Sequence, residues 1–237
     1  MRLSAPIYQL KRRAKFLARD EKIALHAALD RIARDEGFAG WSLLAAQVSG
    51  TSDERDILSR LTDGDTVLLG ARPGHGKTLL GLKLLLDAIR DGRGSVFFTL
   101  EYTEQETRER IRSLEGETPG LGDVVEIVTD DEICAGYIIH HLAGAACGTV
   151  AVIDYLQILD QRRNKPALSE QLDALQAFAR KAGIILAFLS QIDRSFDPQN
   201  KPLPDLRDIR LPNRVDMSLF SKACFLHQGK AQFQTLT

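Results

Sequence analysis

Apolar residues recur along the chain at two different spacings, and the spacing changes near residue 61. Over residues 8–48 the interval is three or four residues, which is typical of amphipathic helices. Three apolar faces result, formed by Leu10, Ala14 and Leu17, then Leu25, Ala28, Leu29 and Ile32, then Trp41, Leu44, Ala45 and Val48. Gly37 is expected to end the second helix. The pattern predicts a small helical N-terminal domain over residues 1–48, followed by a linker and lead-in at residues 49–60.

From residue 61 onward, apolar runs of strand length alternate with helical patterns. The predicted strands cover residues 67–69, 96–100, 124–128, 150–153 and 184–189, and the predicted helices cover residues 78–90, 103–114, 132–146 and 168–182. Nearly continuous apolar strands separated by helices are typical of a parallel sheet covered on both faces. Residues 61–237 are therefore expected to form one α/β domain, with a proline-rich loop at residues 193–212.

Composition narrows the class of protein without naming a function. The 237 residues are 44% hydrophobic and 27% charged, which excludes a disordered, collagen-like or disulfide-stapled chain. Residues 1–48 hold 9 Lys/Arg and 5 Asp/Glu, a net charge of +4, whereas the rest of the chain has a net charge of −5. Three cysteines without a C-x-x-C pair, and the lack of a signal-peptide pattern, favour a cytoplasmic protein. The uncharged run 133–153 is interpreted as a helix and a buried strand, so no contact with a membrane is expected.

The segment GARPGHGKT lies directly between a predicted strand and a predicted helix, which is the context of a phosphate-binding loop. Glycines allow backbone N–H groups to surround a phosphate, and the helix N-terminus favours the same negative charge. Lys77 is expected to reach the β- and γ-phosphates of ATP, and the Thr78 hydroxyl to bind Mg²⁺. The candidate binding residues are Gly70, Ala71, Arg72, Pro73, Gly74, His75, Gly76, Lys77 and Thr78. Ala71 departs from the strict G-x-x-x-x-G-K-T pattern, and the alternative is an ordinary glycine-rich turn.

Polar residues follow three of the other predicted strands. Ligands of parallel α/β sheets bind beyond the carboxyl ends of the strands, where Glu101, Asp154 and Gln191 are expected to lie. Asp154 fits a residue that holds Mg²⁺, Glu101 the base that activates water, and Gln191 a sensor of the γ-phosphate. The alternative is that these residues only cap helices or occupy loops.

Several motifs in order resemble those of DnaB-type replicative helicases. They are ILSRLTDGDTVLLGARP, ARPGHGKT, the TLE ending at Glu101, IDYLQIL (153–159), LSQ (189–191) and PDLRDI (204–209), which precedes an FLHQ strand. The resemblance covers about residues 57–228. It implies a RecA-like ATPase domain that forms a ring and moves on single-stranded DNA, with Glu101 as the catalytic base.

Departures from the family concern both ends of the chain and one residue of the loop. His75 stands where the family usually has Met or another small or apolar residue, and the family's primase-interacting domain is expected to be absent. The strand that carries trans-acting basic residues in the family is expected to be missing after Gln228. The remaining candidates for such a basic finger are Arg207, Arg210, Arg214 and Lys230, so slow hydrolysis by the chain alone is expected.

Two segments are candidate contacts for DNA. Arg2, Lys11, Arg12, Arg13, Lys15 and Arg19 all precede the first acid, Asp20, so they form either a phosphate-contacting surface or a solvated helix face. The loop 193–204 carries Arg194, Phe196 and Lys201 and is either a DNA-contacting loop or a linker. Two other functions stay open: a RecA-like regulatory or recombination ATPase that does not unwind DNA, and a degenerate nucleotide-binding module. The expected protein partner is a second copy of the chain, in a ring, or another ATPase.

Overall fold

Two compact units make up the chain, Met1–Arg55 and Asp56–Thr237. The computed structural model describes residues 7–38, 40–41, 44, 57–115, 119–160, 166–193, 195–197, 201, 203–210, 216–227 and 230–236. Among these residues, no helix combines the length and the apolar character needed to cross a membrane.

The first unit contains the helices α1 (Ile7–Asp20) and α2 (Leu25–Asp35), as the apolar spacing predicts. Their facing sides bury Leu10, Ala14, Ala28, Ile32, Ala33 and Leu44. Past the end of α2, Gly37 has a φ of 85°, a conformation that favours glycine and confirms its predicted place at the helix end. Trp41 and Leu44 are helical, but the remainder of the predicted third helix and the linker lie outside the described residues.

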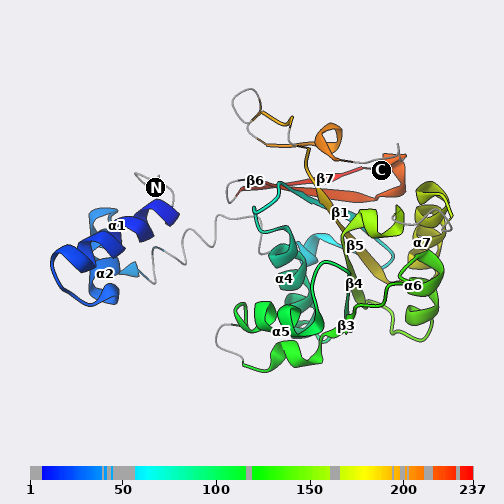
Figure 1. The fold of residues 1–237 in the computed structure, drawn as a ribbon, viewed down its shortest axis with the longest axis horizontal. Helices are drawn as coiled ribbons and strands as arrows, with labels where there is room; N and C mark the ends of the chain where they lie inside the picture. The colour runs from blue at the N-terminus through cyan, green and yellow to red at the C-terminus, as the bar shows by residue number, and fades with distance from the viewer. Residues whose placement is uncertain are drawn as a thin grey trace. The chain divides into compact units, whose positions relative to one another are not determined.

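The second unit is built on a seven-stranded sheet with the order β3-β2-β4-β5-β1-β6-β7 (Figure 1). The first six strands in that order are parallel, and β7 runs antiparallel to β6. The five predicted strands are confirmed as β1 (Thr66–Ala71), β2 (Ser95–Thr99), β3 (Glu126–Val128), β4 (Val150–Asp154) and β5 (Ile185–Gln191). Two further strands are β6 (Lys222–His227) and β7 (Lys230–Thr235).

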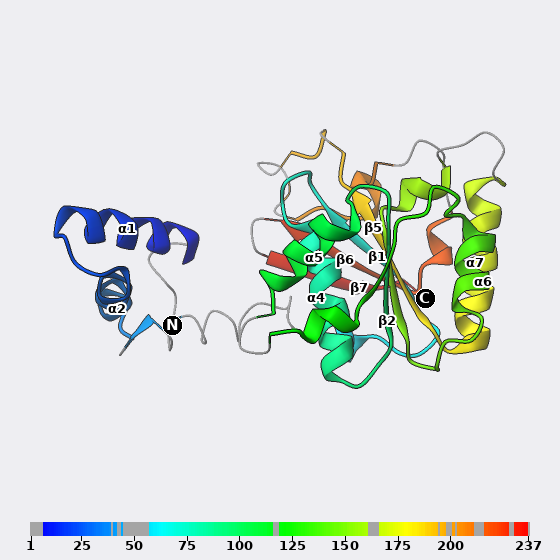
Figure 2. The same ribbon diagram turned by 60° about the horizontal axis from the view of Figure 1, so that its bottom comes forward.

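Helices cover both faces of this sheet, as the sequence predicts. Figure 2 shows α4 (Lys77–Arg90) and α5 (Glu104–Arg112) on one face, and α6 (Ala135–Leu142) and α7 (Leu168–Ala182) on the other. Short 3₁₀ turns occur at η2 (Leu58–Arg60), η3 (Leu121–Val124), η4 (Leu156–Asp160), η5 (Leu206–Asp208) and η6 (Met217–Leu219).

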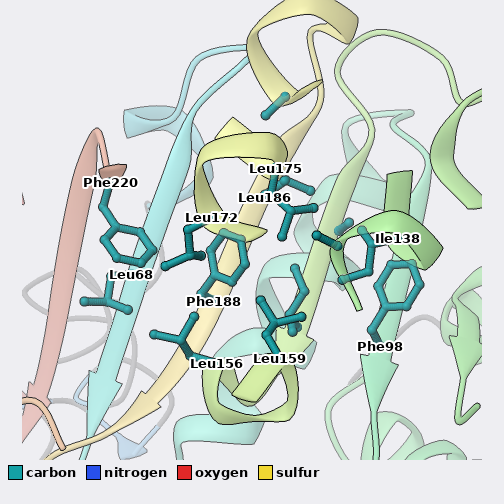
Figure 3. Packing of buried hydrophobic residues seen from close by; sticks show 14 of the residues in the cluster. Leu68, Phe98, Ile138, Leu156, Leu159, Leu172, Leu175, Leu186, Phe188 and Phe220 are labelled. Atoms are coloured by element: carbon teal, nitrogen blue, oxygen red, sulfur yellow. The ribbon is translucent and has the colours of Figure 1, made fainter. Parts of the chain in front are cut away.

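Successive side chains of each buried strand point to opposite faces of the sheet, which divides the core into two layers. Leu68 of β1 belongs to one buried cluster with Phe188, Leu172 and Ile138 on the α6–α7 side (Figure 3), whereas its neighbours Val67 and Leu69 belong to a second cluster with residues of α4. On the α4 side, Gly81 permits a close approach of the helix to the sheet. A Cβ atom there would lie 2.9 Å from Val152 Cγ1 and 3.1 Å from Leu189 Cδ1. This contact fixes the height of α4, and with it the phosphate loop, above β4 and β5.

Two elements are shorter than predicted, because turns with their own hydrogen bonds occupy part of the predicted range. The strand predicted from residue 124 begins at Glu126, since residues 121–124 form η3. The Glu115 carboxylate accepts hydrogen bonds from the N–H groups of Gly120 and Gly122 and stabilises that turn. The helix predicted over residues 132–146 is shorter and spans Ala135–Leu142. The Ala145 N–H bonds to the Leu142 carbonyl in a turn that ends it.

The end of the chain contradicts one expectation. A strand does follow Gln228, because β7 pairs with β6 over the full register from Lys222↔Thr235 to His227↔Lys230. Among the described side chains of β7, only Ala231 and Phe233 pack on the core, which is a weak apolar signal for a strand at the edge of a sheet. The proline-rich loop predicted over residues 193–212 contains short ordered elements at the positions described. Residues 206–208 form η5, and Ile192 pairs with Ile209 in an isolated bridge.

Candidate functional site

Four consecutive strands of the sheet, β2, β4, β5 and β1, end at the same edge. Thr99 pairs with Asp154, and Ala71 pairs with Gln191, so the strand ends lie side by side. The phosphate loop follows β1, Glu101 follows β2, Asp154 ends β4 and Gln191 ends β5. The structure thus brings together the groups that the sequence predicted from different strands.

The loop between β1 and α4 has the backbone of an anion cradle. Gly74 and Gly76 have φ values of 76° and 87°, which side chains other than glycine rarely adopt. No atom lies within 4 Å of a Cβ placed on either glycine, so the space above them is open. Gly76 is the N-cap of α4, whose first N–H groups and positive dipole end face the same space.

Charged groups meet directly beneath this loop. The Lys77 ammonium lies 2.9 Å from Asp154 Oδ1 and 3.5 Å from Glu101 Oε2. The Thr78 hydroxyl donates a hydrogen bond of 2.8 Å to Asp154 Oδ2. Asp154 is completely buried and the Lys77 side chain is 10% exposed, whereas the Glu101 side chain is 35% exposed at the surface of the site. Asp154 is therefore the fixed member of the cluster, and Glu101 is the member that solvent reaches.

The polar atoms of this cluster are incompletely satisfied. Lys77 Nζ and Asp154 Oδ1 form an ion pair, but among the described residues neither has a hydrogen bond of acceptable geometry. Buried polar atoms without such partners are uncommon and point to a missing ligand. A carboxylate and a hydroxyl are oxygen donors of the kind that Mg²⁺ prefers, and a lysine beside a glycine loop suits a phosphate. The donor set fits a magnesium nucleotide.

A pocket of about 330 Å³ opens above these groups. It is lined by Ala71, Arg72, Pro73, Gly74, Gly76, Lys77, Thr78, Leu79, Glu101, Tyr102, Arg110 and Gln191. Of the predicted binding residues, all of which are described, Gly70 and His75 do not line it. Gly70 is instead required by packing, since a Cβ there would lie 2.8 Å from Phe225 Cδ1.

Tyr102 and Arg110 were not predicted from the sequence. The Tyr102 hydroxyl lies 3.4 Å from Glu101 Oε1 and donates a weak hydrogen bond to it. The Arg110 guanidinium lies 4.0 Å from the centroid of the Tyr102 ring. A capping box at Thr103 and Glu106 begins α5. That T-x-x-E signal in the sequence could have placed Arg110 one turn after Glu106, on the same side of the helix.

His75 lies against a small aromatic cluster instead of the pocket. Its ring stacks on His227 with a centroid distance of 5.5 Å, and the Phe196 ring meets His227 edge-on. The Arg72 guanidinium lies 6.0 Å from the Phe196 ring centroid. Burial lowers the pKa of His227, and the nearby His75 and Arg72 lower it further. The phosphate loop is thereby packed against the ends of β6 and of the segment after β5.

The loop predicted to contact DNA is engaged within the chain at the positions described. Phe196 is 4% exposed, so its ring is not presented to solvent. Lys201 forms ion pairs of 2.7 Å with Asp205 and 2.6 Å with Asp208. Arg194 lies outside the described residues.

The four candidates for a basic finger differ in their surroundings. Arg207 pairs with Asp205 at 3.0 Å, although its side chain is 87% exposed. The backbone N–H of Arg210 donates to the Gln191 carbonyl, which attaches the exposed Arg210 to the end of β5. Arg214 and the side chain of Lys230 lie outside what the structure describes.

The parallel sheet, the helices on both faces and the loop between β1 and α4 define the class: the fold is that of RecA-like P-loop ATPases. Solved structures with this fold include a DnaB-like replicative helicase studied with its interactions with primase (TM-score 0.59, 18% identity, 93% of this chain and 66% of that chain). A KaiC-like protein from Pyrococcus horikoshii also matches (TM-score 0.51, 18% identity, 68% and 70%).

Sequence comparison leads to the same proteins. The chain is 25% identical to the replicative DNA helicase DnaB of Helicobacter pylori strain J99 over 211 residues, which is 73% of this chain and 43% of the helicase. It is 23% identical to DnaB of Mycoplasma pneumoniae over 245 residues, 85% and 52% respectively. No family model matches the chain. The resemblance to DnaB-type replicative helicases is confirmed, and the chain spans about half the length of these relatives.

Proposed function

We propose that this chain binds ATP with Mg²⁺ and hydrolyses it to drive movement along, or unwinding of, single-stranded DNA. The similarity to DnaB helicases supports the proposal. The observation that carries it is the convergence of Lys77, Thr78, Asp154 and Glu101 at the carboxyl edge of the sheet, beside an open glycine loop.

In this proposal Lys77 exchanges its internal partner, Asp154, for the phosphates of ATP. Lys77 turns from Asp154 toward the β- and γ-phosphates, because a phosphate in the open loop offers it better hydrogen bonds than the present ion pair. Thr78 and Asp154 would together hold Mg²⁺, which would supply positive charge opposite the charge that develops on the phosphate oxygens.

Glu101 is suited to orient and deprotonate the attacking water. It is the most exposed carboxylate of the cluster, and its backbone N–H donates to Thr99 Oγ1, which fixes the chain where β2 ends. Gln191 lines the same pocket from β5, the strand next to β1. A hydrogen bond from its side chain to the γ-phosphate would couple the bound nucleotide to the segment after β5.

A second copy of the chain, arranged in a ring, is part of the proposal. The transition state of phosphoryl transfer spreads negative charge over the γ-oxygens, and a basic finger from a neighbour is worth ~10³–10⁵ in rate. Arg207, Arg210, Arg214 and Lys230 are the candidates, and their Ala variants mixed with the parent chain would show which residue acts across the interface.

The test measures ATP binding and ATP turnover with and without single-stranded DNA, with the oligomer mass determined in parallel. Lys77→Ala should weaken binding and abolish turnover, whereas Lys181→Ala, an exposed lysine on α7, should change neither. Turnover stimulated by single-stranded DNA supports the proposal. ATP-dependent assembly without strand separation would instead identify a regulatory ATPase, and binding without turnover a degenerate module. Parental turnover by Lys77→Ala would refute the site itself.

A further inference from the structure

Helix α1 of the first unit carries a charge that the unit does not balance. Its fourteen residues, IYQLKRRAKFLARD, include five Lys/Arg and a single acid, Asp20. Arg13 and Arg19 are exposed. The next acid, Glu21, is already paired with Arg31 of α2 at 2.5 Å. By contrast, α2 has two Arg and two Asp. The positive charge is therefore concentrated on α1.

The helix also carries an aromatic residue, Phe16, three positions from both Arg13 and Arg19. Phe16 is 58% exposed, while Leu10 and Ala14 of the same helix are completely buried against α2. Phe16 thus lies outside the face that forms the core of the unit.

A groove of about 760 Å³ lies along this side of the unit. Phe16, Leu17 and Ile32 provide its apolar part, and Arg13 and Arg19 stand on its α1 side. Its α2 side contains Asp35 and the already paired Arg31, and Asp20 lines it where α1 ends. An anion in the groove is therefore expected to contact Arg13 and Arg19 of α1.

We propose that this groove binds single-stranded DNA, with Phe16 stacking on a base and Arg13 and Arg19 contacting the phosphates on either side. Binding of single strands without strong sequence preference combines a positive surface with an aromatic platform, and this surface has both. The site lies in the other unit from the nucleotide pocket. It rests on the proposed function only for the choice of DNA as the anion.

Two other occupants fit the surface less well. A membrane would require a continuous apolar face, but the apolar face of α1 is already buried in the core of the unit. An acidic protein segment would pair with the arginines, but its carboxylates would make no specific contact with the ring of Phe16. A base offers such a ring a face to stack on, whereas duplex DNA keeps its bases stacked on one another.

The experiment uses the full chain, without nucleotide, and follows the anisotropy of a labelled oligothymidine at several salt concentrations. Phe16→Leu keeps an apolar side chain but removes the ring, and should weaken binding roughly 5- to 100-fold with an unchanged salt slope. Phe16→Trp should retain or improve binding. The double variant Arg13→Gln/Arg19→Gln should lower the slope of log K against log salt by ~1.4, since each contact to a single strand contributes ~0.7.

Matched controls separate this surface from the nucleotide site. Arg34→Gln removes an exposed arginine of α2 that does not line the groove, and should leave affinity and slope unchanged. The Phe16→Leu effect should persist in a Lys77→Ala background, so failure of the ATPase proposal does not affect the result. Parental binding by Phe16→Leu, or an unchanged slope in the arginine double variant, would overturn the inference. So would competition by poly-glutamate as effective as that by unlabelled oligothymidine, since it would identify a general anion or acidic-peptide surface.

Discussion

The hydrogen bond from Thr78 to Asp154 links the phosphate loop to the centre of the sheet, and its removal has a calculable effect. Thr78→Val replaces the hydroxyl by a methyl group of similar size. It leaves Asp154 Oδ2 without its donor, at a place where Thr78 is 9% exposed and Asp154 is completely buried. A hydrogen bond to a charged group contributes ~1.5–3 kcal/mol, so the free energy of unfolding of the second unit should fall by that amount. In a domain of this size, this corresponds to about 3–12 °C in the unfolding midpoint.

Thr78→Ser is the matched control because it keeps the hydroxyl and loses only a methyl group. Circular dichroism in urea would follow mainly the second unit, which contains most of the helices. The single tryptophan, Trp41, belongs to the first unit, so its fluorescence reports that unit separately and should not change. The Val variant should be less stable in the first signal only, and the Ser variant should lie close to the parent.

The same pair of variants tests the metal. ATP should bind the parent and Thr78→Ser more tightly with Mg²⁺ than without it, whereas Thr78→Val should show little gain from Mg²⁺. A Val variant as stable as the parent would refute the energetic reasoning about the hydrogen bond. A Val variant with the full gain from Mg²⁺ would refute the role of Thr78 as a metal ligand.

Four further outcomes are expected. Glu101→Gln should bind ATP normally but hydrolyse it ~10²–10⁴ times more slowly, and unchanged single-turnover rates would move the base elsewhere. Tyr102→Phe should lower kcat by about 2- to 10-fold with little change in KM, since it removes one weak hydrogen bond to Glu101; an equal kcat would show that the hydroxyl positions nothing. Gly81→Ala should reduce the free energy of unfolding in urea, because its Cβ would lie 2.9 Å from Val152 Cγ1 and overpacking costs ~1–3 kcal/mol against ~1 gained in helix propensity. A more stable variant would contradict this. Burial depresses the pKa of His227 below 6.5, so the unfolded chain binds the proton more readily and the free energy of unfolding should decrease as pH falls below 6.5. His227→Gln should flatten that part of the pH profile of stability. An unaltered profile would show that other groups cause the pH dependence.

Local patterns in the sequence were sufficient for most elements and for the phosphate loop. The loop could be predicted because its glycines, Lys77 and Thr78 are contiguous, and because backbone conformation and helix start are local properties. The strands that end at Asp154 and Gln191, and the strand that precedes Glu101, could be predicted because buried parallel strands are apolar along their whole length. The edge strand β7 was missed for the converse reason, since only one side of it packs on the core.

The sequence by itself thus determined the alternation of strands and helices, the nucleotide loop and the expectation that strand ends carry the polar residues of the site. It did not determine which strands are neighbours, because hydrophobic spacing reports burial and not pairing. The tertiary structure decided that β2, β4, β5 and β1 are adjacent, and thereby that Lys77 meets Asp154 at 2.9 Å. It also decided that Phe196 is buried while Phe16 is exposed. Each of these aromatic residues has an arginine within three positions in the sequence. Only the packing around each shows which one solvent reaches.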